Sequence, residues 1–481
     1  MLTHDRLFLG GGWKEPAGRG RIEVVSPATE EVIGWVPDAA TADADHAVEA
    51  ARDAFDRGPW PLLDVTERME YVRRFAAEIR ERGDELADVL CAEVGLPRHT
   101  LPAGQLAKTD ATFEAFLDLA ADHPWEETRT GSGGRRLRVR HLPVGVVAAI
   151  VPWNAPLLIT AMKLAPALLA GATVVLKPAA ESPLHTYLLA EAALASGLPP
   201  GVLNILPAGP EVSEHLVRHP GVDKVSFTGS TAVGRRVGAI CGGEMKRCTL
   251  ELGGKSASIV LDDFELTPQG VRMLVTGAMV NSGQVCAALS RVLVPRGRYK
   301  EVVDAMAETA GALVVGDPSD PATDIGPLVS RRQRDRVERY LRIGREEGAT
   351  AVVGGGRADM ERGWYVQPTV FSGVDNGMTI AREEIFGPVA AVIPYEEEAE
   401  AIALANDSDY GLAGAVWTAD PDRGALVAGR VRSGAVAVNA PGALDPFGPF
   451  GGLKQSGMGR EGGHEGIAAY TELQTILLPA R

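Results

Sequence analysis

The chain has few cysteines and a deficit of basic residues, and each shortage excludes a class of protein. It contains 4 cysteines in 481 residues, too few for the disulfide framework of a small secreted scaffold. No Cys-X-X-Cys pair or Cys/His cluster occurs, so a zinc site is not expected. The 48 Lys and Arg residues against 63 Asp and Glu residues give a net charge of −15. An acidic surface repels phosphate backbones, so nucleic acids are not expected as partners.

Long uninterrupted apolar runs are also missing. The first residues, MLTHDRLFLGGGWKEP, contain no apolar segment of signal-peptide length, so we expect a cytoplasmic protein. The most apolar stretch, 154–177, is interrupted by Pro156, Pro166 and Gly171 and carries Lys163 in its middle. These residues favour a buried helix followed by a buried strand over a membrane span, so no membrane partner is expected.

The composition is otherwise close to that of soluble globular proteins, with 45% hydrophobic and 23% charged residues. At roughly 150 residues per domain the length corresponds to about three domains, or two large ones. A chain this long can bury its core without disulfides or metal. Helical periodicity predicts helices over 42–55 and 66–95, and strand pairs are predicted at 26–37 and 131–144.

Strand and helix patterns alternate four times from residue 144 onward. The predicted strands are VGVVAAIV, TVVLKP, VLNILPA and KVSFTG, and a helical segment follows each of them. This alternation is typical of a parallel, doubly wound sheet, whose ligands bind beyond the carboxyl ends of the strands. The polar residues at those ends are Asn154, Lys177, and Gly229 with Ser230.

A second α/β run begins near residue 256. The predicted strand SASIVLDD is followed by a helical stretch to about residue 282, and further strands are predicted at SRVLVP and GAVAVNAP. The C-terminal segment TELQTILLPA is also predicted to be a strand. Because it lies far from the other strands in sequence, we expect it to join another sheet or another subunit.

Cys286, in NSGQVCAAL, differs from the other three cysteines. Small residues around it leave the thiol with little steric cover. A thiol can carry an acyl group if a base generates its thiolate. The other three are interpreted as small buried hydrophobic residues.

Glu251, in TLELGGKS, ends an apolar strand before two glycines. It can cap the strand or face solvent, or it can be a general base whose pKa is raised by apolar surroundings. The following GGKS is not a P-loop, because that motif needs a glycine where Thr249 stands.

Four further polar positions have a structural interpretation, a functional one, or both. Asn154, in VPWNAP, can form an Asn-X-Pro turn or donate to a developing oxyanion. Lys177 can be an ordinary strand-end lysine. Ser230 opens a helix whose backbone amides could hold a diphosphate. Glu384, in REEIFGP, would by itself be read as a surface turn residue.

Taken in order, PWNAP, LKP, FTGST, ELGGKS, GQVC, EEIFGP and PFGGLKQSG form one pattern. With these motifs the chain resembles the NAD(P)-dependent aldehyde dehydrogenase superfamily over almost its whole length. The resemblance implies an α/β fold with a Rossmann-type cofactor domain, an α/β catalytic domain and a small β oligomerisation element. It implies the following divisions: 1–122 and 143–252 for NAD(P) binding, 253–440 for catalysis, and 123–142 with 470–481 for oligomerisation.

The resemblance also implies roles for five residues in oxidation of an aldehyde to a carboxylic acid. Cys286 would attack the aldehyde, and Asn154 would stabilise the oxyanion together with the backbone N–H of Cys286. Glu251 would activate the water that hydrolyses the resulting thioester. Lys163 and Glu461 match positions that assist proton removal. No histidine base is then needed.

The positions implied for the cofactor are Trp153, Lys177, Gly229, Ser230, Glu384 and Phe386. Relatives often have a glutamate three residues after the lysine, where it accepts a hydrogen bond from the ribose 2′-hydroxyl. Here Ala180 stands at that position and Glu181 follows it. NAD is the expected cofactor, and NADP is possible because a 2′-phosphate is repelled less.

The substrate positions depart from the family as well. Ala155, Met162 and Leu444 stand at positions that are often aromatic in relatives, whereas Phe450 keeps its aromatic ring. A wide apolar tunnel is expected, and with it a medium-sized or aromatic aldehyde. The expected assembly is a homodimer or homotetramer.

Three alternatives stay open. The first is a CoA-acylating relative, which generally lacks the base that Glu251 supplies. The second is a non-catalytic protein that keeps the fold, although Cys286 and Asn154 are both present. The third is a thiol amidase, which needs a histidine base that the sequence does not offer at familiar spacing.

Overall fold

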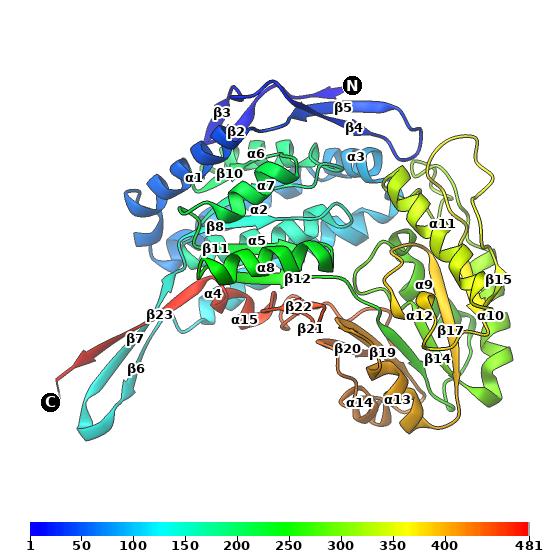
Figure 1. Cartoon of the computed structure of the whole chain (residues 1–481). Helices are drawn as coiled ribbons and strands as arrows, with labels where there is room; N and C mark the ends of the chain where they lie inside the picture. The colour runs from blue at the N-terminus through cyan, green and yellow to red at the C-terminus, as the bar shows by residue number, and fades with distance from the viewer. Residues whose placement is uncertain (480–481) are drawn as a thin grey trace.

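The computed structural model describes residues 1–479, in which two α/β units form the body and a narrow arm projects from it (Figure 1). The first unit contains an eight-stranded sheet in the order β22-β12-β11-β8-β9-β10-β2-β3. Its parallel strands are β8 (Val146–Ile150), β9 (Thr173–Lys177), β10 (Leu203–Ile205), β11 (Lys224–Thr228) and β12 (Arg247–Glu251). Antiparallel strands complete its edges: β2 (Leu7–Leu9), β3 (Gly12–Lys14) and β22 (Gly457–Met458).

Helices cover both faces of this sheet, and a separate apolar cluster fills each layer. The helices of one layer are α2 (Val65–Glu81), α4 (Ala107–Asp122), α5 (Pro156–Ala170) and α6 (His185–Ser196). Those of the other layer are α1 (Thr41–Asp56), α7 (Pro210–Arg218) and α8 (Thr231–Gly243). The strand-and-helix alternation predicted from residue 144 onward is therefore confirmed. Central parallel strands covered on both faces are largely apolar, as VVAAI in β8 is.

Two sequence-based boundaries were wrong. The helix predicted over 66–95 is two helices, because Arg82 has non-helical backbone angles and α3 (Gly83–Val94) begins after it. Glycine is a poor helix former, which favours a break at this point. The strand pair predicted within 26–37 begins earlier: β4 (Arg21–Val25) precedes the turn and β5 (Val32–Pro37) follows it, and β1 (Leu2–Thr3) joins the same small sheet.

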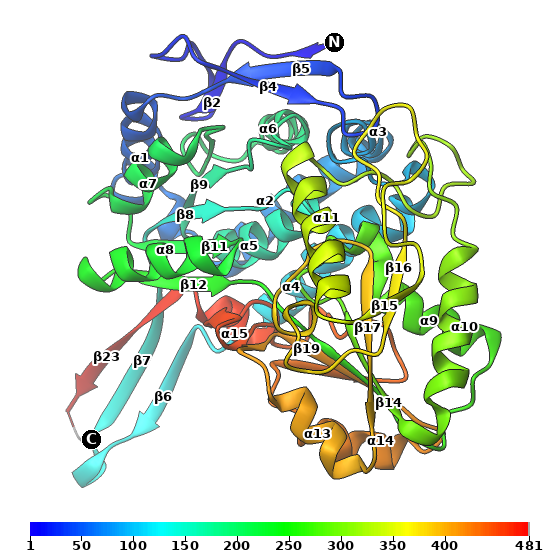
Figure 2. The same cartoon turned by 45° about the vertical axis from the view of Figure 1, so that its right-hand side comes forward.

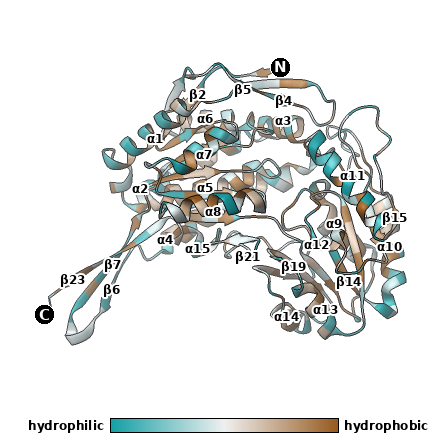
Figure 3. Ribbon diagram, in the orientation of Figure 1, coloured by the Kyte–Doolittle hydropathy of each residue, from teal (hydrophilic) through white to brown (hydrophobic). Residues whose placement is uncertain are grey.

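The second unit contains a seven-stranded sheet in the order β15-β16-β17-β14-β13-β19-β20, parallel except at β15. Its strands are β13 (Ala257–Val260), β14 (Arg291–Pro295), β15 (Thr350–Val353), β16 (Thr369–Ser372), β17 (Val389–Tyr395), β19 (Ala413–Trp417) and β20 (Ala435–Val438). Its helices are α9 (Pro268–Met279), α10 (Tyr299–Gly311), α11 (Arg331–Glu346), α12 (Thr379–Arg382), α13 (Glu398–Asn406) and α14 (Pro421–Ala428). The helical stretch expected to about residue 282 ends at Met279. Figure 3 shows the hydrophobic strands inside this unit and the hydrophilic surface of α11 outside.

The segment after residue 440 returns to the first unit. A short ribbon of β18 (Tyr410–Gly411) and β21 (Leu453–Lys454) precedes β22, which pairs with β12. Helix α15 (Gly463–Ala468) then packs against α4 and α5. No division had been predicted for this segment, and its return brings Glu461 next to α5.

The arm is a three-stranded antiparallel sheet in the order β23-β7-β6, and it extends away from both units in Figures 1 and 2. Its strands are β6 (Glu126–Thr130), β7 (Arg136–Pro143) and β23 (Thr471–Leu478). The strand pair predicted over 131–144 was misplaced, because residues 132–134 form the turn and β6 lies before them. Of the predicted C-terminal element, residues 480 and 481 lie outside the described residues. Within 1–479, no helix combines the length and apolar character needed to cross a membrane.

Candidate active site

A cleft of about 1140 Å³ lies at the carboxyl ends of the strands of the first sheet. Segments that follow β8, β9 and β11 line one wall, and residues of the second unit line the other. The cleft brings together eight of the residues expected from the sequence: Trp153, Asn154, Lys177, Gly229, Ser230, Cys286, Glu384 and Phe386. Glu251, Lys163 and Glu461 do not line it. They are buried behind it, with exposed fractions of 4%, 0% and 3%.

The turn between β11 and α8 requires a small residue followed by a cap. A Cβ on Gly229 would lie 2.5 Å from the ring of Phe227. Ser230 is the N-cap of α8, and its Oγ accepts a hydrogen bond from the backbone N–H of Val233 at 3.4 Å. Because Ser230 lines the cleft, the N-terminus of this 13-residue helix opens toward it, which is a favourable place for an anionic group.

Lys177 ends β9 in the same wall. Burial lowers the pKa of its ammonium group to about 8, although the carboxylates of Glu181 and Asp38 oppose the shift. Three residues further on, Ala180 places only a methyl group against the cleft. The carboxylate of Glu181 forms an ion pair with Arg332 of the second unit, with 3.0 Å between oxygen and nitrogen.

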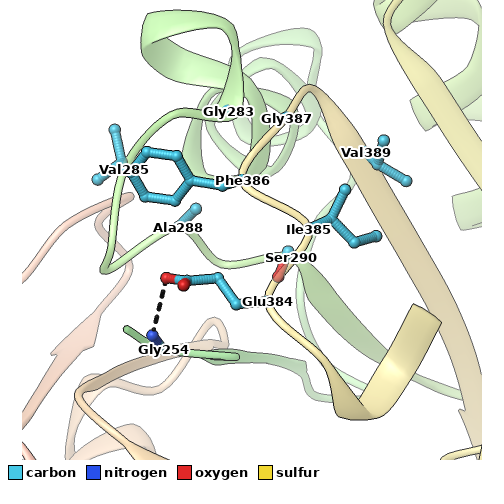
Figure 4. Close-up of a pocket in the computed structure, with 10 residues that line it drawn as sticks. All are labelled: Gly254, Gly283, Val285, Ala288, Ser290, Glu384, Ile385, Phe386, Gly387 and Val389. Carbon is cyan, nitrogen blue, oxygen red and sulfur yellow. Dashed lines mark hydrogen bonds between the residues drawn. The ribbon is translucent and has the colours of Figure 1, made fainter. Parts of the chain in front are cut away.

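Glu384 crosses the opposite wall toward the first unit. Its Oε1 accepts a hydrogen bond from the backbone N–H of Gly254 at 3.1 Å, as Figure 4 shows. A Cβ on Gly253 would lie 2.5 Å from the other oxygen, so the two glycines after Glu251 allow this approach. Burial raises the pKa of Glu384. The surface-turn interpretation of this residue was therefore wrong.

Phe386 and Trp153 face each other across the cleft. Their ring centroids are 5.4 Å apart and the rings are perpendicular, with an interplanar angle of 88°. Phe386 has a left-handed backbone conformation (φ 63°), which is uncommon for a bulky residue. This backbone conformation fixes the direction in which the ring leaves the chain.

The segment before Cys286 is a left-handed turn. Asn281, Ser282 and Gly283 have φ values of 54°, 54° and 70°. A Cβ on Gly283 would collide with the backbone of Gly387, next to Phe386. The hydroxyl of Ser282 donates to the carbonyl of Gly326 at 2.8 Å. These contacts hold the turn rigidly, and Cys286 follows it into the cleft.

Asn154 is attached to this turn by two hydrogen bonds. Its Nδ2 donates to the carbonyl of Gln284 at 2.9 Å, and its own carbonyl accepts from Nδ2 of Asn281 at 2.8 Å. The first strand-end turn of the sheet and the turn that carries Cys286 therefore form one unit. Asn154 retains a second N–H on the same nitrogen.

The thiol of Cys286 is neutral at rest. Burial raises its pKa to about 12, and the carboxylates of Glu384 and Glu251 add to the shift. The backbone N–H groups of Ala287 and Cys286 act in the opposite direction, which means that they point toward the sulfur. A base is needed to form the thiolate, and two amides are available to stabilise negative charge beside it.

Glu251 ends β12 in a water-poor environment. Neither of its carboxylate oxygens accepts a hydrogen bond from another described residue. Burial and the nearby Glu461 raise its pKa well above the ordinary value, and Lys163 and Arg460 only partly oppose them. A carboxylate in this state is a strong proton acceptor, as a general base requires.

Lys163 and Glu461 form a buried ion pair beside Glu251. The distance between Nζ of Lys163 and Oε1 of Glu461 is 2.5 Å, and Nζ also donates to Oγ of Ser226 at 3.0 Å. Lys163 comes from the middle of α5, and Glu461 from the segment that returns to the first unit. The pair gives Glu251 a charged neighbour of each sign.

The sequence-based reasoning missed several residues of the site. Gln284 and Asn281 bind Asn154, and Ser226 contacts the ion pair. The polar run NSGQ before Cys286 was visible as a signal for a constrained turn. Ser226 carried no signal, because a single serine inside an apolar strand is common.

Comparison with known proteins agrees with this geometry. A model of the Aldehyde dehydrogenase family matches residues 13–476. A geranial dehydrogenase from Castellaniella defragrans is 46% identical over 477 residues, which cover 99% of each chain. The crystal structure of an aldehyde dehydrogenase from Mycobacterium tuberculosis complexed with NAD+ superposes with a TM-score of 0.97 at 49% identity, covering 100% of this chain and 99% of that one.

A third relative is a mutant aldehyde dehydrogenase C from Pseudomonas syringae, in complex with NAD+ and octanal. It has a TM-score of 0.94 and 41% identity and covers 98% of this chain and 96% of that one. The chain belongs to the aldehyde dehydrogenase family. It is an oxidoreductase that oxidises an aldehyde with a nicotinamide dinucleotide.

Proposed function

We propose that the protein oxidises a medium-sized or aromatic aldehyde to the carboxylic acid with NAD, through a thioester on Cys286. The arrangement of Cys286 and Glu251 carries this proposal. The thiol opens into the cleft, whereas the carboxylate lies behind it, close enough for its charge to raise the pKa of the thiol. A nucleophile beside a base of high proton affinity is what thioester chemistry needs.

The first step forms the carbon–sulfur bond. The Cys286 thiol loses its proton to Glu251, and the thiolate attacks the aldehyde carbon. The carbonyl oxygen becomes an oxyanion, which accepts hydrogen bonds from the free N–H of Asn154 and the backbone N–H of Cys286. The product of this step is a thiohemiacetal.

The second step forms and hydrolyses the thioester. NAD in the cleft would supply the acceptor for the hydride that leaves the thiohemiacetal carbon, and Ser230, Glu384 and Phe386 would hold it there. Glu251 first passes the thiol proton to the Lys163–Glu461 pair and then takes a proton from water, the water oxygen attacks the thioester carbon, and the thiolate of Cys286 leaves. Lys163 and Glu461 receive the proton from Glu251 on its way out of the site.

The cleft fits a dinucleotide. Lys177 supports binding at the adenosine ribose, Gly229 and Ser230 at the diphosphate, and Glu384 with Phe386 at the nicotinamide ribose and ring. Residues 1–122 and 143–252 form the cofactor domain in this proposal, and residues 253–440 the catalytic domain. Ala180 leaves space for a 2′-phosphate, so NADP is a weaker second cofactor.

Several observations support an apolar substrate. One relative is named for geranial, and another was crystallised with octanal. In this chain the small side chain of Ala155 follows Asn154 directly and the flexible side chain of Met162 lies further along α5, and Leu444 is 42% exposed. The substrate approaches Cys286 from this side, opposite the cofactor cleft.

Assembly and location follow from the arm and the cysteines. In strand β23, Leu473 and Leu477 are 63% and 57% exposed, which supports burial against a second copy in a homodimer or homotetramer. All four cysteines are free thiols, which supports a reducing compartment such as the cytoplasm.

The test is NADH or NADPH formation with a panel of aliphatic and aromatic aldehydes, each with NAD and with NADP, in the absence of CoA. We expect turnover with NAD and the highest kcat/KM for medium-chain or aromatic aldehydes. Activity that requires CoA would indicate the acylating reaction instead. Absence of any reduced cofactor under both conditions would contradict the proposed function.

A further inference from the structure

A buried polar cluster continues beyond the Lys163–Glu461 pair, and the steps proposed above do not use it. Ser226 stands in the middle of β11 and is fully buried. Its Oγ lies 3.0 Å from Nζ of Lys163, 3.3 Å from Oε1 of Glu461 and 3.2 Å from the hydroxyl of Tyr470. Three charged or phenolic groups from different elements therefore meet at one hydroxyl.

The donor and acceptor roles at Ser226 follow from the partners. A serine hydroxyl donates one hydrogen bond and accepts up to two. The ammonium group of Lys163 can only donate, and the carboxylate of Glu461 can only accept, so the hydroxyl proton of Ser226 points to Glu461. Tyr470 must then donate to Ser226. Burial raises the pKa of Tyr470, so its hydroxyl keeps the proton that it donates.

The outer end of this chain of hydrogen bonds is anchored at the root of the arm. Tyr470 lies between α15 and β23, and its carbonyl accepts a hydrogen bond from the backbone N–H of Val144 at 2.9 Å. The ammonium nitrogen of Lys224 lies 5.0 Å from the centre of the Tyr470 ring and donates to Oγ1 of Thr249 at 2.8 Å. The phenol is thereby fixed on both sides.

We propose that Ser226 and Tyr470 are positioning residues of the reaction: the hydrogen bonds from Tyr470 to Ser226 and from Ser226 to Glu461 hold the Glu461 carboxylate beside Glu251 and aligned with Lys163, and so set the pH at which Glu251 can take a proton from water. This inference rests on the proposed function. Donors aimed at a buried carboxylate stabilise its charged form.

Other charges bear on the same group. Lys163 on α5, Arg460 and Glu461 act on Glu251. Tyr470 and Lys224 on β11 lie near Glu461, and Cys241 and Cys248 lie near Lys224. Ser226 differs from all of them because it is the shared contact of both members of the ion pair. Its removal leaves the number of charges unchanged and withdraws only a donor.

The experiment compares Ser226→Ala and Tyr470→Phe with the wild-type protein in the pH profile of thioester hydrolysis. We expect the acid limb of Ser226→Ala to move to lower pH by about one unit, because a Glu461 charge that is held less firmly beside Glu251 raises the pKa of Glu251 less. Tyr470→Phe should move the limb in the same direction by less, and the burst of NADH from Cys286 should be kept in both.

The double variant tests whether the two hydroxyls form one chain. If Tyr470 acts only through Ser226, adding Tyr470→Phe to Ser226→Ala should cause no further shift. Thr173→Val is the matched control, because Thr173 is fully buried in the same sheet and its hydroxyl bonds only the carbonyl of Ala51. Its pH profile should match that of the wild type.

Two results would overturn the inference. One is a uniform loss of rate at every pH with an unmoved acid limb, which is what loosened packing alone would produce. The other comes without substrate, from infrared titration of the buried carboxyls with Glu251→Gln identifying the Glu251 band: an unmoved midpoint of that band in Ser226→Ala, where a downward shift is expected. A wild-type protein without NADH formation would contradict the proposed function, and the infrared titration would still decide the role of Ser226.

Discussion

The two sides of Cys286 are built by different physical means. On the cofactor side the cleft is open, half-buried and exposed side chains such as Lys177 and Ser230 line it beside buried apolar ones, and glycines let backbone and carboxylate approach each other. On the other side Glu251, Glu461 and Lys163 are almost completely buried. The first side recognises a large ligand through shape and backbone groups. The second handles protons, because removal from water raises the proton affinity of Glu251.

The two sides share strands, and this links them. Glu251 ends β12, and its backbone carbonyl accepts a hydrogen bond from the N–H of Gly229 at 3.0 Å. Gly229 belongs to the cofactor side. A change on one side should nevertheless have a distinct kinetic signature. A change on the cofactor side should weaken NAD binding, whereas a change on the buried side should slow thioester hydrolysis.

Cys286→Ala removes the atom that both sides serve and should have the largest effect. We expect NADH formation to fall by at least about a thousandfold, because no thiohemiacetal can form. NAD binding, measured by calorimetry, should be retained. Cys91→Ala is the control, since Cys91 is buried in the core far along the chain and should keep its activity. Turnover that survives in Cys286→Ala would mean that another nucleophile carries the acyl group.

Glu251→Gln breaks the proton-handling side only. The amide has the size of the carboxylate but cannot accept a proton, so the thioester should accumulate. We expect one equivalent of NADH per active site in a burst, followed by steady turnover lower by about a hundredfold or more. Rapid-mixing absorbance measures both phases. Normal steady turnover would remove Glu251 as the base for hydrolysis.

The sequence predicted the cofactor side better than the other side, for a physical reason. Strand-end positions follow from the alternation of strands and helices, so Asn154, Lys177 and Gly229 were recognisable as neighbours in space. The contact between Glu384 and Gly254 joins residues 130 positions apart and has no local signature. Tertiary packing alone decides such contacts.

The buried side was even less predictable. Lys163 and Glu461 are 298 residues apart. Lys163 was expected within a buried helix, but no partner for its charge was indicated, and an isolated glutamate such as Glu461 would ordinarily be assigned to a solvated surface. The motif resemblance suggested both, but local sequence patterns gave no reason to pair them. Ser226 and Tyr470 had no signal at all, because a serine within KVSFT and a tyrosine before a strand are unremarkable residues.

Lys177→Met tests the cofactor side separately. The loss of a charged donor should weaken NAD binding by roughly tenfold, while kcat at saturating NAD changes little. Because the pKa of Lys177 is about 8 in the free protein, its ammonium form is present below that value and is lost as the pH rises through it. Affinity for NAD should therefore fall above about pH 8 in the wild type.

Calorimetric titration with NAD across this pH range measures that dependence. In Lys177→Met the fall in affinity above pH 8 should disappear. Lys300→Met, at an exposed position of α10, is the control and should keep the wild-type dependence. If the affinity for NAD fell by the same amount above pH 8 in both variants, a group other than Lys177 would cause the pH dependence.

The smallest expected effect concerns the electrostatic contact between the two sides. The negative charge of Glu384 raises the pKa of Cys286, which is about 12 in the free protein. Glu384→Gln removes that charge, so the pKa of the thiol should fall and a larger fraction should be thiolate at any pH below it. Alkylation by iodoacetamide at a fixed, mildly alkaline pH should then be a few times faster.

The neighbouring carboxylate provides the control for this measurement. Glu383 is exposed and accepts a hydrogen bond from the hydroxyl of Tyr340 at 2.6 Å, away from the thiol. Glu383→Gln should therefore alkylate at the wild-type rate. If both variants reacted at the wild-type rate, the Glu384 carboxyl would be uncharged at that pH, as the burial that raises its own pKa favours. A faster reaction in Glu384→Gln alone would show that the cofactor-side carboxylate keeps the nucleophile protonated until the cleft is filled.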